Sequence, residues 1–409
     1  MEIISRIRGK VENHAAALAL MAGAAAFFIA NASLSKIMNS VDYGAYSLIA
    51  TLLTISTSFG LLGHEQSILR LSSIKNKILE IPKKELHTSV LLCFISPIAG
   101  ILYLYNSTTA PIIGILDIAI VYTLYTLGLG ATLFCYIDRG RDLKFHSQLH
   151  AASWKVSFLA GAITCLLLPS PTLTSLLLPS TIFQIIFVVI TFKTYPISAP
   201  RATISKDNKT YNSSLNFSFL LTMLTGAALS FGDRLFIQTN FGLETLGRFF
   251  LYQNLLLSPL LIISSYLAIN QTQHIKNGKC KNDVIATIKK QAYTSVAIYI
   301  SILPIVLFVP LFDDEHKLSC LIMLAIGASR IPYSTISAIQ SIGSSPRSHH
   351  IANIISLCPL LLFLLIYHFD YLTNNAITPT LYLSILAGWL LRSAYILKTY
   401  IGATDVHTS

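Results

Sequence analysis

The sequence predicts an all-α integral membrane protein with about twelve transmembrane helices, arranged in two pseudo-symmetric six-helix halves with both termini cytoplasmic. Three observations lead to this fold class. The composition is too apolar for a soluble protein, basic residues gather in alternate connections between apolar runs, and the two halves of the chain resemble each other.

The composition identifies the solvent as a lipid bilayer. Hydrophobic residues make up 53% of the 409 residues and charged residues only 11%, and the mean hydropathy is +0.64. Soluble domains carry about 25% charged residues, so this chain could not cover its own surface in water. A soluble enzyme, a disordered chain and a secreted disulfide scaffold are excluded. The six cysteines include no CxxC pair, and we expect them to be small core residues.

Twelve apolar runs lie between charged breaks, and a helix needs about 20 apolar residues to span a bilayer. The predicted spans are 15–35, 44–63, 88–105, 112–134, 152–169, 173–192, 215–238, 246–267, 291–311, 318–340, 351–367 and 377–396. The first run follows a basic segment and ends at Ala30-Asn31-Ala32, which resembles a signal-peptide cleavage site. Because another apolar run follows at once, we expect this helix to be retained.

The basic residues indicate the orientation. Twenty-two Lys and Arg residues lie in the two tails and in the connection after every second span, whereas only Lys36 and Lys317 lie on the other side. The basic side is cytoplasmic by the positive-inside rule and can also contact anionic lipid. No basic-aromatic module accompanies the net charge of +11, so no nucleic-acid partner is expected. The acidic run at 313–315, beside His316, favours a solvated loop over a metal site.

An internal repeat relates the two halves of the chain. A shift of 203 residues aligns Gly23-Ala24-Ala25 with Gly226-Ala227-Ala228, Gly44 with Gly247, and Tyr46 with Phe249. We therefore expect an N-terminal half at 1–192, a cytoplasmic linker at 193–213, a C-terminal half at 214–396 and a tail at 397–409. Transporters built from parallel repeats bind substrate at the interface of their halves.

Five basic residues fall inside the predicted spans: Lys155, Arg234, Arg248, Arg330 and Arg392. Lys155 and Arg392 are expected to snorkel to a nearby cytoplasmic helix end. Arg330 is about 18 Å into the tenth helix, near the middle of the bilayer. A buried charge costs about 2.5–3.5 kcal/mol even on insertion scales, so it should face a cavity or a partner.

The outer part of the membrane holds the remaining candidates. Asp233 could neutralise Arg234 or Arg248, or this group could handle substrate or protons, and the sequence leaves both interpretations open. Arg330 has no acid nearby in sequence and is interpreted as a substrate ligand. The repeat aligns Arg234 with Asn31, the binding candidate of the first half, whose cavity is therefore expected to carry less charge.

The depth of the acidic residues along the predicted helices indicates their roles. Asp117 and Asp233 are the candidates to carry a coupling proton or cation, and Glu65 is expected at the cytoplasmic interface. The chain contains no phosphate-binding glycine loop, no HExxH and no GxSxG motif. We therefore expect no enzymatic activity, no cofactor and no metal site, and an ATP-driven pump would need a partner subunit.

The motifs around the helix ends resemble those of a known family. They are Asp42-Tyr43-Gly44-Ala45-Tyr46, the segment GLLGHEQSILR at 60–70, Asp233-Arg234-Leu235-Phe236-Ile237, and Leu246-Gly247-Arg248-Phe249. This arrangement resembles the Wzx-type O-antigen and polysaccharide flippases of the multidrug/oligosaccharidyl-lipid/polysaccharide (MOP) exporter superfamily. Phe249 departs from the pattern, because tyrosine is common there.

The resemblance implies a function in polysaccharide biosynthesis. Such proteins flip undecaprenyl-diphosphate-linked oligosaccharide repeat units across the bacterial inner membrane, for O-antigen of lipopolysaccharide or a related surface polymer. Their partners would be a polysaccharide polymerase and a chain-length regulator. Arginine suits a diphosphate, because its planar fork binds two oxygens and stays charged when buried.

Other functions remain open. A multidrug exporter of the same superfamily would favour acidic cavities, whereas the deep charges here are mainly arginine. A membrane-embedded enzyme of polysaccharide assembly would need a catalytic acid or base in an outer loop, and a scaffold without transport activity would need neither. A major-facilitator transporter is disfavoured because its loop motif is absent at 72–77.

Overall fold

The computed structural model describes residues 2–65, 68, 73–75, 78–107, 113–195, 201–205, 213–276, 280–343 and 346–402. The chain divides into two compact units. Unit 1 comprises Met1–Met223 and Arg234–Leu251, and unit 2 comprises Leu224–Asp233 and Tyr252–Ser409.

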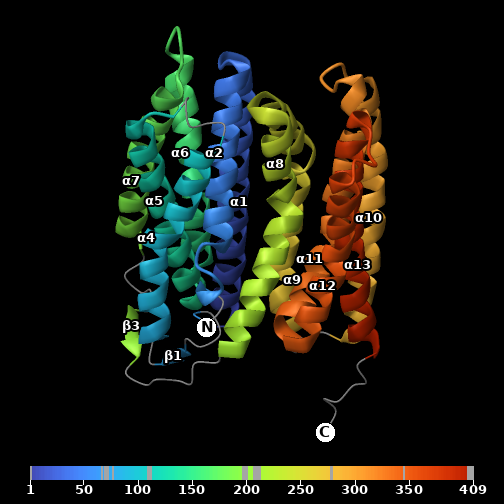
Figure 1. The fold of residues 1–409 in the computed structure, drawn as a ribbon. Helices are drawn as coiled ribbons and strands as arrows, with labels where there is room; N and C mark the ends of the chain where they lie inside the picture. The colour runs from blue at the N-terminus through green and yellow to red at the C-terminus, as the bar shows by residue number, and fades with distance from the viewer. Residues whose placement is uncertain are drawn as a thin grey trace. The chain divides into compact units, whose positions relative to one another are not determined.

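Unit 1 is a helical bundle with a small sheet at one end (Figure 1). Its helices are α1 (Glu2–Ile37), α2 (Ser40–Phe59), α4 (Lys83–Asn106), α5 (Ile115–Gly140), α6 (Lys144–Leu166) and α7 (Leu173–Lys193). The α6 helix is central, because it packs against α1, α5 and α7.

Unit 2 is purely helical among the described residues. It contains α9 (Ser258–Lys276), α10 (Lys281–Phe308), the short 3-10 helix η1 (Asp314–His316), α11 (Lys317–Gly343), α12 (Pro346–His368) and α13 (Asn374–Gly402). The α11 helix packs against α9, α10 and α13, and α12 packs against α13.

The long helix α8 (Ser213–Leu256) contributes to both units. It is interrupted at Gly242, whose φ of 83° and ψ of −177° are accessible essentially only to glycine. Residues 224–233 pack with unit 2 and residues 234–251 with unit 1. The division into halves at 1–192 and 214–396, which the internal sequence repeat suggests, stays a prediction.

Ten helices among the described residues are long and apolar enough to cross a membrane. They are α1 from His14 onward, α4, α5, α6, α7, α8 from Leu220 onward, α10, α11, α12 and α13. This agrees with the predicted multi-pass helical membrane class, whereas the exact number of twelve and the location of the termini stay predictions. The α9 helix offers only the shorter apolar stretch Ser258–Ala268.

The α2 helix is rich in hydroxyl side chains and is not among those ten. Ser47 donates to the carbonyl of Tyr43 at 2.7 Å, and Thr54 donates to that of Ala50 at 2.7 Å. Hydroxyls that bond one turn back along their own helix need no water. The polar residues of α2 can therefore lie buried in the bundle.

Several predicted helix boundaries were wrong. The span predicted at 246–267 is two pieces, since α8 ends at Leu256 and α9 begins at Ser258. The spans predicted to begin at 152 and 291 begin at Lys144 and Lys281, and the last helix runs to Gly402 instead of 396. The cause is that polar stretches such as KFHSQLH form helix and bury side chains, including His146 and His150.

The structure overturns the snorkelling interpretation of Arg392, because about 15 Å of α13 follows this residue. Lys155 lies about 16 Å inside α6 and is partly exposed, so snorkelling of its side chain stays a prediction. Only 2% of Arg392 is exposed. Its guanidinium is held inside unit 2 and does not reach an aqueous helix end.

A three-stranded sheet, which the sequence did not predict, joins two connections of unit 1. Its strands are β1 (Ser73–Lys75), β2 (Ile78–Pro82) and β3 (Arg201–Ser205). β1 pairs antiparallel with β2, and β2 pairs parallel with β3 from Ile78↔Arg201 to Pro82↔Ser205. The connection after α2 and the connection after α7 therefore lie together, as the positive-inside pattern requires of two loops on one side.

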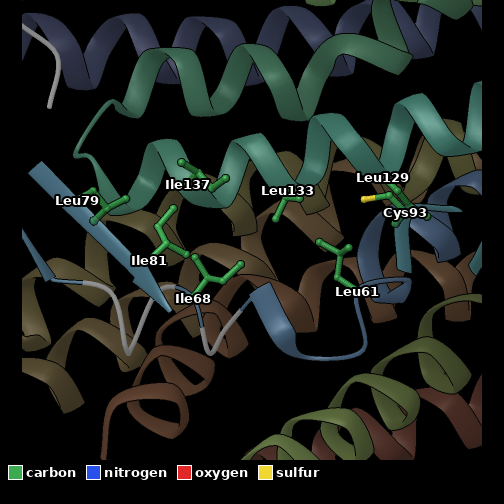
Figure 2. Packing of buried hydrophobic residues seen from close by; sticks show 8 residues of the cluster. All are labelled: Leu61, Ile68, Leu79, Ile81, Cys93, Leu129, Leu133 and Ile137. Carbon is green, nitrogen blue, oxygen red and sulfur yellow. The ribbon is translucent and has the colours of Figure 1, made fainter. Parts of the chain in front are cut away.

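The connection after α2 also contributes to the hydrophobic core, as Figure 2 shows. The cluster consists of Leu61, Ile68, Leu79, Ile81, Cys93, Leu129, Leu133 and Ile137. The first four precede α4, and the others belong to α4 and α5. Glu65 lies in this connection and is only 2% exposed. It is therefore buried inside the protein, and its depth at the cytoplasmic interface stays a prediction.

Candidate functional site

The six residues singled out from the sequence fall into two groups, one in each unit. Asn31, Asp117, Arg234 and Arg248 belong to unit 1, whereas Asp233 and Arg330 belong to unit 2.

Arg234 is bound by a hydroxyl and an aromatic ring. Its Nη1 donates to Oγ1 of Thr51 on α2 at 3.3 Å. Its Cζ lies 5.0 Å from the centre of the Phe250 ring, which belongs to the second segment of α8. Thr51 and Phe250 are both fully buried. A ring face attracts a cation more strongly when water is excluded. The Phe250 ring can therefore stabilise the guanidinium of Arg234 without neutralising its positive charge.

Asn31 lies in the same aromatic layer. Its Nδ2 donates to the carbonyl of Phe27 at 2.6 Å, and its Oδ1 accepts from the Tyr46 hydroxyl at 3.0 Å. The Tyr46 ring is 6.1 Å from Phe250, the ring below Arg234. Asn31 is fully buried, and both the nitrogen and the oxygen of its side-chain amide form hydrogen bonds within the protein. The structure thus gives it a role in joining α1 and α2, and a substrate contact stays a prediction.

Arg248 occupies a different environment. Its side chain is 47% exposed, and Nη2 lies 3.7 Å from Oε1 of Glu244, one turn earlier in α8. Exposed ion pairs of this kind contribute about 0–1 kcal/mol to stability. The position follows the break at Gly242, so Arg248 lies near the start of a helical segment.

Asp117 lies in the first turn of α5, where it caps the helix. Its Oδ2 accepts from the backbone N–H of Gly114 at 3.1 Å, and its Oδ1 accepts from Oγ1 of Thr174 at 2.6 Å. A carboxylate is favoured there by the unpaired N–H groups and the positive end of the helix dipole. This structural role explains the buried acid by itself, and proton transfer at Asp117 stays a prediction.

Asp233 is buried within unit 2. Its Oδ2 accepts a short hydrogen bond from the amide Nε2 of Gln253. The same nitrogen lies 3.0 Å from the hydroxyl of Tyr382 on α13. The carboxylate is therefore connected to a polar chain that joins both segments of α8 to α13. Gln253 and Tyr382 were not singled out from the sequence, because neither carries a charge or belongs to a motif.

Arg330 lies deep in α11 and stacks on aromatic rings. Its Cζ is 3.8 Å from the centre of the Trp389 ring and 5.5 Å from that of Tyr333. Its backbone carbonyl accepts from Oγ of Ser264 at 2.7 Å, which fixes α11 to α9. Among the described residues, no carboxylate lies within ion-pair distance of this guanidinium, and its Nε is buried without a hydrogen-bond partner.

Two polar clusters were missed from the sequence. In unit 1, Asp138 accepts from the Tyr195 hydroxyl at 2.7 Å and from Nη1 of Arg141 at 3.2 Å. In unit 2, Arg392 donates to Asn353 and Gln340. Asp138 and Arg141 lie beyond the predicted span 112–134, and Arg392 was expected at a helix end. Position along the predicted helices therefore gave no reason to single these residues out.

The acidic run beside η1 matches the expected loop. Asp314 pairs with Lys317 at 2.5 Å, and Asp313 accepts from the Tyr252 hydroxyl at 3.0 Å. Within the described parts of the chain, no group of three His, Cys, Asp or Glu side chains could hold a metal ion.

Comparison with known proteins identifies the fold. No protein-family model matches the sequence, and no curated protein matches it. The crystal structure of the eukaryotic MATE transporter AtDTX14 matches with a TM-score of 0.56 and 14% identity, over 97% of this chain and 96% of that one. A multidrug resistance MATE family transporter of the MOP superfamily, in an inward-facing conformation, matches with a TM-score of 0.51 and 12% identity over 97% and 96%. The chain therefore has the fold of MATE transporters of the MOP superfamily.

Proposed function

We propose that this protein flips undecaprenyl-diphosphate-linked oligosaccharide repeat units across the bacterial inner membrane, for O-antigen or a related surface polysaccharide. The transporter fold supports the transport class. The sequence motifs of the Wzx-type flippases and the excess of arginine among the deep charges support the substrate class.

The state of Arg330 carries this proposal. A deep guanidinium that stacks on Trp389 and has no described carboxylate partner keeps its charge for a ligand. The diphosphate is anionic, and guanidinium groups bind phosphate oxygens in pairs. An organic cation, the typical cargo of a drug exporter, would be repelled by the same group.

Other residues take roles around this one. Arg234 and Arg248 are proposed to contact the diphosphate or sugars in unit 1, and Asn31 to hold the aromatic layer beside Arg234. Asp233 is proposed to carry the coupling proton or cation, because a buried carboxylate bound to a neutral amide can gain or lose a charge. Alternating access then requires a substrate that binds the two conformations with different affinity.

The test is made in a strain lacking the protein. We expect loss of the surface polysaccharide ladder and accumulation of single lipid-linked repeat units on the cytoplasmic leaflet. Units stranded on the periplasmic leaflet would indicate a polymerase, which is the enzymatic alternative. Complementation with Arg330→Gln should fail, whereas intact activity after replacing both Arg234 and Arg330 would indicate a scaffold.

Multidrug export is the second candidate, because one of the matching structures is a multidrug resistance transporter. It predicts a normal polysaccharide ladder together with altered drug sensitivity in the deletion strain. The polymerase and the chain-length regulator are proposed partners of the flippase alone, so co-purification with either would separate the two candidates further.

A further inference from the structure

Unit 2 holds a second arginine, Arg392, which lies one turn along α13 from Trp389, the ring on which Arg330 stacks. Arg392 donates from Nη1 to Oδ1 of Asn353 at 2.8 Å, and from Nη2 to Oε1 of Gln340 at 3.2 Å. Both acceptors are neutral amides, so neither balances the positive charge. The side chain is 2% exposed, which leaves water unable to balance it either.

No described carboxylate pairs with either arginine. The sequences of α9, α11, α12 and α13 contain neither Asp nor Glu. Asp283 lies in the first turn of α10, and Asp233 of α8 accepts from Gln253 instead. A buried charge without a counter-charge is costly, so this arrangement favours an anion from outside the chain.

The unused hydrogen-bonding groups of α11 and α13 are all donors. Among the described side chains of these two helices, the buried polar atoms without a hydrogen-bond partner are Nε of Arg330, Nε of Arg392, Nε2 of Gln340 and Nε1 of Trp389. Two belong to α11 and two to α13, which pack together. The groups are also connected, since Arg392 bonds to Gln340 and Arg330 stacks on Trp389.

The chemistry of these donors defines the ligand. Buried polar groups are normally hydrogen-bonded, and several unpaired donors in one place indicate a missing acceptor. A tetrahedral oxyanion supplies both the negative charge and several acceptor oxygens, and arginine forks match its geometry. A cation or an apolar ligand would satisfy neither requirement.

We propose that Arg330 and Arg392, with Gln340 and Trp389, form a binding site for a phosphate group between α11 and α13. The phosphate can belong to a free anion or to a lipid head group. Arg330 is shared with the transport function proposed above, whereas Arg392 is not. The site does not require that the cargo be a lipid-linked oligosaccharide.

The test uses the purified full-length protein in uncharged detergent with gluconate as the only other anion. Inorganic phosphate and pyrophosphate are titrated at constant ionic strength while the melting temperature is followed. We expect a saturable rise of several degrees, because a ligand that binds only the folded state stabilises it. The rise should be lost in Arg392→Gln and in Arg330→Gln. Arg347→Gln is the matched control, since Arg347 is exposed on the first turn of α12.

Reconstitution identifies the source of the phosphate. If a head group occupies the site, nanodiscs containing phosphatidylglycerol should abolish the effect of pyrophosphate, whereas nanodiscs made of a phosphate-free galactolipid should retain it. If a free anion occupies it, the effect should be equal in both. If Arg392→Gln does not fold, the loss of the phosphate effect is measured with Arg330→Gln alone.

Two results would overturn the proposal. One is an equal rise for the wild type and for both variants. The other is no rise in detergent and no difference between the two lipid compositions. A different result would overturn the proposed transport function but not the phosphate site. In that case the deletion strain would have normal surface polysaccharide, while the purified protein would still bind pyrophosphate.

Discussion

Gly44 and Gly247 lie in backbone contact within unit 1, where α2 meets the second segment of α8. A Cβ added at Gly247 would lie 3.3 Å from Cα of Gly44, and a Cβ added at Gly44 would overlap the backbone carbonyl of Leu243. These are the two glycines that the internal repeat aligns with each other. The repeat thus marks a place where two helices approach more closely than side chains allow.

The first prediction concerns this contact. Gly44→Ala should destabilise the protein by about 1–3 kcal/mol, because the new methyl group forces the backbone of α8 away from α2. The melting temperature and the yield of folded protein measure the effect. Gly130→Ala is the control, since no atom lies within 4 Å of an added Cβ there. Equal melting temperatures for the two variants would show that the contact is not tightly packed.

The second prediction separates charge from geometry at Arg330. Lysine preserves the positive charge but loses the planar fork and most of the stacking on Trp389. We therefore expect Arg330→Lys to support a reduced polysaccharide ladder and Arg330→Gln to support none. Arg248→Gln should change stability by no more than about 1 kcal/mol, because the Arg248–Glu244 ion pair is exposed. Full activity of Arg330→Gln would contradict a role in anion binding.

The third prediction is a pH dependence of stability that arises at Glu65. Burial raises the pKa of Glu65 from 4.5 to about 7. The folded protein therefore binds this proton more tightly than the unfolded chain does. The resulting stability is complete below about pH 4.5 and is lost as the pH rises through about 7.

Replacing Glu65 with glutamine should remove this dependence. Glu65→Gln should be more stable than the wild type at pH 8, by at most about 3 kcal/mol, and should show no advantage at pH 4.5. Thermal melts at the two pH values measure the difference. His87→Gln, in an exposed position on the neighbouring helix α4, serves as the control. A wild-type advantage at pH 8 would mean that Glu65 is stabilised as an anion.

The fourth prediction distinguishes the two candidate coupling residues. Asp117→Ala should cost about 1–2 kcal/mol of stability, because the start of α5 loses its cap, yet transport should still respond to an imposed proton gradient. Asp233→Asn should leave the fold intact and abolish that response. Flipping in vesicles, with and without the gradient, is the measurement. A gradient response that survives Asp233→Asn but not Asp117→Ala would reverse the assignment.

The membrane class and most of the helices could be predicted from the sequence, since hydrocarbon makes strong demands on composition. An apolar run of about 20 residues has few other stable environments. The ends of the helices were less predictable. Polar residues at the start of α6 and at the start of α10 extend those helices, because the adjacent helices or the surrounding water satisfy their side chains.

The candidate site was only partly predictable. Arg330 and Arg234 could be identified as unusual from their positions within the predicted spans. A charge deep in an apolar run costs free energy however the helix packs. Depth could not show that Asp117 caps α5 or that Asn31 bonds to Tyr46, since both depend on the neighbouring helix. It also misplaced Arg392, whose helix continues to Gly402.

The sequence by itself determined the solvent of this protein, its helical character and the residues whose charge needs an explanation. These follow from composition and from the period of apolar residues, which are local properties of the chain. Only the tertiary structure decided which partner each charge has. The rotation of a helix about its axis is set by packing against its neighbours, and that rotation brings Arg330 onto Trp389 and Arg392 onto Gln340.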